Sequence, residues 1–504
     1  MNGWLAALGD RINPIVVKEV RQAVRGRLFR FGYGLTLAAA VTISMTVLMT
    51  DERNVPDQQL GPMLASSIFG CLLAACFAFI PFSAFMSMGG EWEENTYDLL
   101  VLSNLSPRRI VYGKLISSLV QSLVCFSAFT PFFVFAFLLR GIDLRNLLLM
   151  LGAVLILSPC VSLIALGLSS VGGGRFQRVG LMVLLLIGLI FLTIFGMYLS
   201  SFALNPRLFG FRSESLIVVG VIVSIALAIG IYYGEIACAR LCHPEENGST
   251  GIRVAVLLAQ IGVLIWAASL FAKDPDPSLL SAFTCVALFG MLWPCAGFAS
   301  ESERLGRRVA LHVPKSRLLA LLVAPFLPGG GRGMIYWFVA NAVMAAGLAL
   351  AWGGFAATPW TAAGLGRWSG AGLLSIAYAA LFCTLYLAIP TRLFARRSAE
   401  PRMRRLARVC VVLFLVASII LPTLLAFILG GRRGEAFEHP LNPFWVLHET
   451  WDGHGSSAPL LIMVAPLALL LTFAMNFGRM RAGVREVLEA SRARREAERA
   501  KTPA

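Results

Sequence analysis

A polar segment carrying both signs of charge interrupts an otherwise very apolar chain, and its residues 90–114 are GEWEENTYDLLVLSNLSPRRIVYGK. Its acidic side chains come first, and its basic side chains come last. Paired charges around a leucine-rich centre suit docking of another protein, because charges set register while apolar side chains supply contact. The alternative is a solvated loop whose charges only keep it out of lipid. The side chains that we expect to carry this contact are Glu91, Glu93, Glu94, Thr96, Asp98, Leu99, Leu100, Ser106, Pro107, Arg108, Arg109, Gly113 and Lys114.

Two helices must position these side chains. Ser106 is a typical N-cap residue and Pro107 a typical first helical residue, so a helix is predicted to begin there and to continue into an apolar run. Residues 91–102 lack Pro and Gly and carry their acids early, which predicts a preceding helix. The segment is therefore expected to form a helix–turn–helix.

A second polar element, NPIVVKEVRQAVRGRLFR at 13–30, precedes the first apolar run. Asn13 can cap a helix that Pro14 opens. Valines 17, 20 and 24 then share one face, and the basic side chains share another, which predicts an amphipathic helix along the membrane surface. The polar residues singled out here are Asn13, Pro14, Lys18, Glu19 and Arg21.

The composition places the chain among membrane proteins, since 58% of its 504 residues are hydrophobic and only 14% are charged. Runs long enough, or nearly so, to cross a bilayer predict an all-α polytopic protein with about 12 transmembrane helices. They lie near 31–50, 62–88, 115–139, 146–171, 180–201, 216–238, 254–272, 279–299, 335–357, 371–391, 409–430 and 458–477.

The basic residues predict the orientation. With the N-terminus in the cytoplasm and every run crossing once, 34 of the 43 Lys and Arg fall on the inside. The sequence therefore predicts an integral, multi-pass inner-membrane protein with both termini cytoplasmic. The net charge of +16 is explained in the same way, and no basic stripe with interleaved aromatics points to nucleic acid.

Other chemistries find little support. Glu235 is the only Asp, Glu, Lys, Arg or His inside the predicted spans. It is either a carboxylate that reaches the headgroup layer or a residue at the inner mouth of a pathway. A three-histidine metal site at His439, His448 and His454 is a weaker reading than an interfacial helix there. The cysteines imply neither a disulfide framework nor a zinc site, so no metal is expected. The chain has no phosphate-binding GxxxxGK[ST] motif, so no cofactor of its own is expected.

The two polar elements together resemble the permease subunit of ABC-2 type transporters. In that family the first stretch is an interfacial connecting helix, and the second is the coupling region that seats on an ATPase. The matching positions are Glu91, Glu93, Asn95, Thr96, Asp98, Leu99, Leu100, Ser106, Pro107, Gly113 and Lys114. Asn95 stands where Gly is frequent, and Ser103-Asn104 where Thr-Pro is frequent. The resemblance is specific over about 13–125 and implies ATP and Mg²⁺ on a separate, dimeric, cytoplasmic ATP-binding subunit.

The sequence predicts four regions. They are an interfacial helix at 1–30, a six-span permease unit at 31–240 with the coupling loop 89–114, a second six-span unit at 241–478, and a basic helical tail at 479–504 that frays. The second unit is either a diverged repeat, with Glu301 and Glu303 placed much as Glu91 and Glu93, or an unrelated extension. A repeat would let one chain form the pathway, whereas an extension would call for a homodimer. The stretch PGGGRG, Pro328 to Gly333, is predicted to form a flexible re-entry into the ninth span.

The expected function is transport, in the export direction, by a permease without chemistry of its own. The scarcity of charge in the spans favours an amphipathic or lipid-like substrate. Two alternatives stay open: a membrane scaffold, and an ion-coupled secondary carrier without an ATPase partner.

Overall fold

The computed structural model describes residues 14–49, 57–93, 106–139, 141–171, 175–204, 213–243, 246–273, 292–355 and 458–499, with a few positions between 409 and 424. These residues form helices and connecting turns without a strand. The chain divides into two compact units, Met1–Cys242 and His243–Ala504, close to the boundary at 240 predicted from the sequence.

Seven helices of the described residues are long and apolar enough to cross a membrane, and a bent helix pair raises this to eight. The seven coincide with the first seven predicted spans, so the prediction of an all-α membrane protein is confirmed. Twelve spans are not confirmed. The runs at 371–391 and 409–430 lie largely outside the described residues, and of the run at 279–299 only α13 (Leu292–Ala299) is described.

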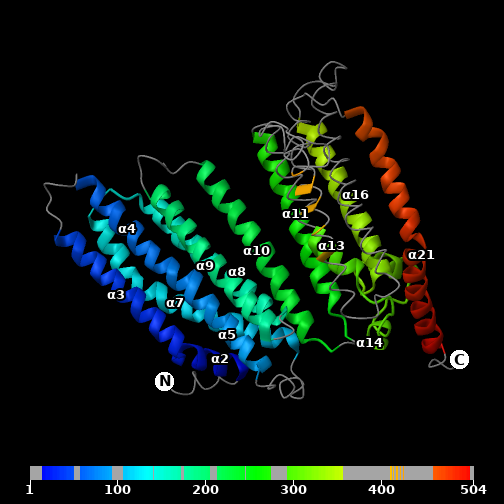
Figure 1. Ribbon diagram of the computed structural model, residues 1–504, viewed down its shortest axis with the longest axis horizontal. Helices are drawn as coiled ribbons and strands as arrows, with labels where there is room; N and C mark the ends of the chain where they lie inside the picture. The colour runs from blue at the N-terminus through cyan, green and yellow to red at the C-terminus, as the bar shows by residue number, and fades with distance from the viewer. Residues whose placement is uncertain are drawn as a thin grey trace. The chain divides into compact units, whose positions relative to one another are not determined.

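The first unit is a helical bundle whose helices run side by side (Figure 1). An N-terminal helix, α2, leads after Gly26 into the spans. The helices are α2 (Pro14–Arg25), α3 (Arg27–Met49), α4 (Asp57–Leu73), η1 (Ala74–Phe79), α5 (Ile80–Glu93), α7 (Pro107–Leu138), α8 (Leu144–Val171), α9 (Arg175–Ala203) and α10 (Ser213–Leu241). Side chains of α4, η1, α7 and α8 form the centre of its apolar core.

The second span changes its winding halfway. The six residues of η1 form a π-helix between α4 and α5, and Ile80 N donates to Ala75 O five residues back. Pro81 follows directly; it has no N–H, and its ring crowds the carbonyl four residues earlier, which favours wider winding. Ser158 Oγ donates to Cys76 O at 3.3 Å and lies 2.7 Å from Ser122 Oγ. Helix α8 therefore satisfies a carbonyl that lipid could not, and α7 contacts the serine that does so.

Helices α8 and α10 approach each other closely through glycines. Gly230 and Gly234 share one face of α10, and Cβ atoms there would lie 3.0 Å from Cys160 and 3.1 Å from Leu163 of α8. A Cβ at Gly167 of α8 would overlap the backbone of Tyr233. Small residues four apart allow such close helix contacts in membranes. This packing fixes the end of α10 that carries Glu235.

The second unit is built around α16. Trp337, Tyr336 and Met334 of this helix are buried, together with Cys295 and Phe298 of α13. The helices are α11 (Ser249–Lys273), α13, α14 (Arg307–Ala310), α15 (Arg317–Val323), the 3-10 turn η2 (Ala324–Phe326), α16 (Gly330–Phe355) and α21 (Ala458–Arg499).

The last described helix corrects the predicted tail. α21 continues without a break from the twelfth apolar run through Arg499, so the tail does not fray from residue 479 onward. Its polar half packs on the connection between α13 and α16: Val487 joins Val309, Val313 and Ala320 in a small buried cluster. The prediction failed because the basic residues of the tail have specific partners that their spacing alone does not show.

Candidate functional site at the ends of α5 and α7

Helix α7 begins where the sequence predicts, at Pro107. Ser106 is extended and precedes the first turn, and Arg109 N donates to Ser106 O at 2.9 Å. The hydroxyl of Ser106 makes no capping hydrogen bond, contrary to the expectation from its type. The fixed backbone of Pro107 therefore contributes more to this start than the serine side chain does.

A buried ion pair joins the two polar elements that the sequence singled out. Lys114 Nζ of α7 lies 3.2 Å from Glu19 Oε2 of α2 and donates to Ser87 Oγ of α5 at 3.1 Å. The side chain of Lys114 is 3% exposed, and that of Glu19 is 11% exposed. Gly113 is buried as well. Neither Lys114 nor Gly113 is therefore accessible to a partner protein, and the structure gives Lys114 an internal role in joining three helices.

A second ion pair connects the start of α7 with the end of α10. Arg108 Nη2 lies 3.3 Å from Glu235 Oε2, and the two side chains are 62% and 16% exposed. Glu235 was singled out for its position near a pathway mouth, and Arg108 for docking. The structure brings these separately predicted residues together at one end of the bundle.

The other predicted residues divide into described and undescribed positions. Arg109 is exposed. Lys18, Arg21 and Arg25 line a shallow basic groove along α2 with Val17 and Gln22. Glu91 and Glu93 lie in the last turn of α5, and their side chains are not described. The positions outside the described residues are Asn13, Glu94, Thr96, Asp98, Leu99 and Leu100.

The second unit contains a polar network that the sequence did not reveal. Three guanidinium groups, of Arg253, Arg332 and Arg479, face three carboxylates across the bend between η2 and α16. Arg253 and Arg332 are fully buried. The sequence did offer one signal. Arg253 directly precedes the predicted span at 254–272, and Arg332 lies in the proline-glycine run before the predicted span at 335–357.

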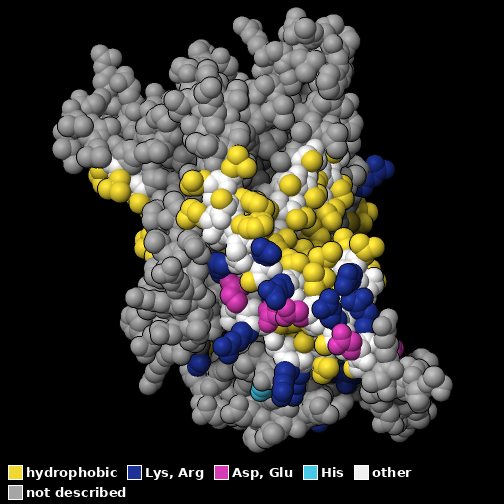
Figure 2. All heavy atoms as spheres, turned by 90° about the vertical axis from the view of Figure 1, so that its right-hand side faces the viewer, with side chains coloured by type: hydrophobic (Ala, Val, Ile, Leu, Met, Phe, Trp, Pro, Cys, Tyr) yellow, Lys and Arg dark blue, Asp and Glu magenta, His cyan; other side chains and the backbone are white. Residues whose placement is uncertain are grey.

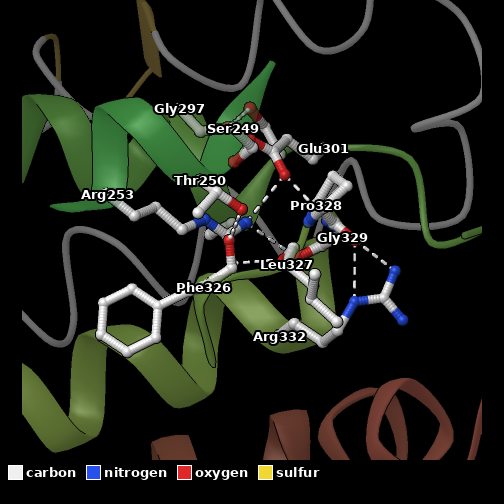
Figure 3. A network of polar contacts seen from close by, with 12 residues as sticks. Ser249, Thr250, Arg253, Gly297, Glu301, Phe326, Leu327, Pro328, Gly329 and Arg332 are labelled. Carbon is white, nitrogen blue, oxygen red and sulfur yellow. Dashed lines mark hydrogen bonds and ion pairs between the residues drawn. The ribbon is translucent and has the colours of Figure 1, made fainter. Parts of the chain in front are cut away.

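Glu301 is the centre of one half of this network (Figure 3). Its Oε2 accepts from Arg253 Nη2 at 2.7 Å and from Gly329 N at 2.8 Å, and its Oε1 accepts from Ser249 Oγ at 2.7 Å. The Arg253 guanidinium also lies 5.0 Å from the centre of the Phe298 ring. A buried charge is tolerated where ion pairs and hydrogen bonds of this kind compensate it, although Arg253 Nε is buried without a hydrogen-bond partner.

Glu303 and Glu486 form the other half. Glu303 Oε2 accepts from Gly331 N at 2.9 Å, and its Oε1 accepts from Arg479 Nε at 2.8 Å. Arg332 Nη1 donates to Glu486 Oε2 at 3.0 Å. Glu301 and Glu303 thus bind the glycine turn and its arginines from inside the unit.

The glycine turn is held rather than flexible. Gly329 has φ +142°, a backbone conformation that favours glycine. A Cβ at position 331 would overlap the carbonyl of Arg479. The glycines therefore let α21 and the carboxylates approach the backbone, which corrects the prediction of a flexible re-entry.

The far end of α21 is anchored by weaker, exposed contacts. Ser491 Oγ donates to Lys315 O at 2.9 Å, and Lys315 Nζ pairs with Glu498. The ammonium group of Lys315 lowers the pKa of the Glu498 carboxyl. This pair therefore contributes to the fold above the ordinary pKa of a glutamate and is lost as the pH falls through the lowered value.

Metal chemistry has no support in the part of the chain that the structure describes, where no three His, Cys, Asp or Glu side chains converge. His439, His448 and His454 lie outside the described residues. Comparison of the chain with protein families, curated proteins and solved structures finds no match.

Proposed function

We propose that the chain is the membrane-spanning subunit of an ABC transporter of the ABC-2 type. A separate cytoplasmic ATP-binding dimer, which holds ATP and Mg²⁺, docks on residues 89–114 and drives export of an amphipathic or lipid-like substrate. The chain lies in the inner membrane with both termini in the cytoplasm. The observation that carries this proposal is the pair of ionic links that leave α7 at Lys114 and Arg108.

Through these two ion pairs, docking of the ATP-binding subunit can displace helices of the bundle. A displacement of the segment before α7 moves Lys114, and the buried Glu19 carries the movement to α2. Arg108 transmits it to Glu235 and so to α10, which packs tightly on α8. Helices that cross the bilayer can then change their packing together. Alternation between inward-facing and outward-facing forms requires such a concerted change.

The distribution of charge favours this function over an ion-coupled carrier. In the described spans, every Asp, Glu, Lys, Arg and His side chain lies within about two turns of a span end. Carriers driven by ions place such groups near the middle of the membrane. A pathway without them suits a substrate that is itself largely apolar.

The test is co-purification of the tagged full-length chain from native membranes, followed by an ATP hydrolysis assay and mass spectrometry of the bound proteins. The triple charge reversal Glu91→Lys, Glu93→Lys and Asp98→Lys should release a Walker-motif ATPase that the wild-type chain retains. A matched control, Glu489→Lys with Glu496→Lys, reverses exposed charges on α21. Equal retention of the ATPase by wild type and triple variant, or equal loss in the control, would refute the docking site.

A further inference from the structure

The connection that precedes α16 turns sharply before the span begins. The axis of Arg317–Phe326 makes an angle of 91° with that of Gly330–Met344. A helix that crosses a membrane runs close to its normal, with a typical tilt of about 20°. The segment that contains α15 and η2 must therefore lie nearly in the plane of the membrane if α16 crosses it.

This in-plane segment is apolar on both of its faces. Ala320 and Ala324 are buried against the cluster that contains Val487 of α21. The opposite face presents leucines to the surroundings, and Leu318 and Leu322 are 74% and 69% exposed. Leu319 and Leu321 are exposed beside them. Residues 318–327 contain no polar side chain, so this face gives water nothing to hydrogen-bond except backbone.

The polar network fixes the segment in this position. Arg253 Nη1 donates to Pro325 O at 2.6 Å and to Leu327 O at 2.7 Å, and Thr250 Oγ1 donates to Phe326 O at 2.7 Å. Three successive carbonyls, two in η2 and one directly after it, are thus satisfied within the protein. A backbone with its carbonyls satisfied can enter a lipid interface without a large penalty. A rigid segment also loses little conformational entropy when it binds.

The stretch of sequence that contains the segment carries charge of one sign. No Asp or Glu occurs between Arg304 and Phe355. Arg304, Arg307 and Arg317 are exposed. On the face shown in Figure 2, the hydrophobic side chains give way to a band of Lys and Arg with fewer Asp and Glu. Clustered basic residues beside an apolar face attract anionic lipid headgroups.

We infer that residues 317–326 form an in-plane anchor that inserts its leucines among the acyl chains of the adjacent leaflet, while Arg304, Arg307 and Arg317 bind anionic headgroups. A protein partner fits this face less well. Protein interfaces combine apolar anchors with polar and aromatic side chains, whereas this run offers leucine, alanine and valine almost alone. The inference does not depend on an ATPase partner.

Photocrosslinking tests the inference on the full-length chain. The photoreactive residue p-benzoylphenylalanine replaces Leu319 or Leu322. The variants are reconstituted into liposomes of equal parts phosphatidylglycerol and phosphatidylcholine, whose acyl chains differ in mass so that the adducts of the two lipids can be told apart. Position Ala497, exposed on α21, is the control. We expect lipid adducts at 319 and 322 at least fivefold above those at 497. Adducts at the background of position 497 would overturn insertion.

Two further readouts complete the test. In the wild-type chain, phosphatidylglycerol should make up most of the lipid adducts, because each basic residue near the surface contributes about a fivefold preference for anionic lipid. In the triple variant Arg304→Gln, Arg307→Gln and Arg317→Gln, the share of phosphatidylglycerol adducts should fall close to that of phosphatidylcholine adducts. An unchanged share would overturn the headgroup assignment. Irradiation in native membranes should also give lipid adducts, and crosslinks to another protein in their place would show that the face docks a protein.

Discussion

Removal of Glu19 should destabilise the first unit, because it takes away a carboxylate that pairs with the buried ammonium group of Lys114. The side chain of Lys114 is 3% exposed, and its ammonium group also donates a hydrogen bond to the hydroxyl of Ser87. Breaking a buried ion pair from one side typically costs about 3–5 kcal/mol. The pair here is 3.2 Å long and Glu19 is partly exposed, so we expect about 2–3 kcal/mol for Glu19→Ala.

This loss is large enough to measure by thermal unfolding. A change of about 1 kcal/mol lowers Tm by about 2–4 °C in a unit of this size, so Glu19→Ala should lower Tm by about 5–10 °C. The assay is thermal unfolding of the purified full-length chain in detergent. The control Glu496→Ala removes an exposed carboxylate of α21 and should leave Tm within about 1 °C of wild type.

A double-variant cycle isolates the pair itself. Replacement of both partners by apolar residues of similar size, Glu19→Leu with Lys114→Met, should recover most of the lost stability, since buried ion pairs are often replaced by apolar pairs at little cost. If Glu19→Ala leaves Tm unchanged, the carboxylate does not neutralise Lys114. If the double variant is as unstable as the two single variants combined, the residues are not coupled and the assigned contact is wrong.

Three further predictions address other elements. Gly331→Ala should destabilise the second unit by about 1–3 kcal/mol or more because its Cβ overlaps a backbone carbonyl, whereas Gly262→Ala, which meets no atom within 4 Å, should not lower Tm. Arg108→Gln should change Tm little, since its exposed ion pair contributes about 0–1 kcal/mol, yet it should reduce substrate-stimulated ATP hydrolysis of the reconstituted complex. Ser158→Ala should cost only about 0.6 kcal/mol in thermal unfolding, the average for a hydrogen bond between membrane helices. A lower Tm for the Gly262 variant would contradict the packing assigned to the glycines. Wild-type ATP hydrolysis by the Arg108 variant would contradict the role given to its ion pair. Unfolding of the Ser158 variant at ordinary temperature would contradict the small contribution assigned to its hydrogen bond.

Sequence determined the parts of this protein that depend on local patterns. Apolar runs of the required length predicted the helices from Arg27 to Leu270, because the bilayer sets both length and composition. Ser106 and Pro107 predicted the start of α7, because proline fixes the backbone at a first helical turn. The amphipathic pattern after Pro14 likewise predicted α2.

Only the tertiary structure decided what the charged residues contact. Spacing placed Glu19 on a surface helix and Lys114 in a docking segment, and packing of α2 on α7 buried both of them. The same holds for Arg253 and Glu301, which are 48 residues apart and meet only because α11, α13 and α16 converge. Partners that are distant in the chain leave no local period in the sequence. The lengths of the apolar runs and local start signals therefore predicted the helices, whereas the partners of their charges were settled by which helices pack together.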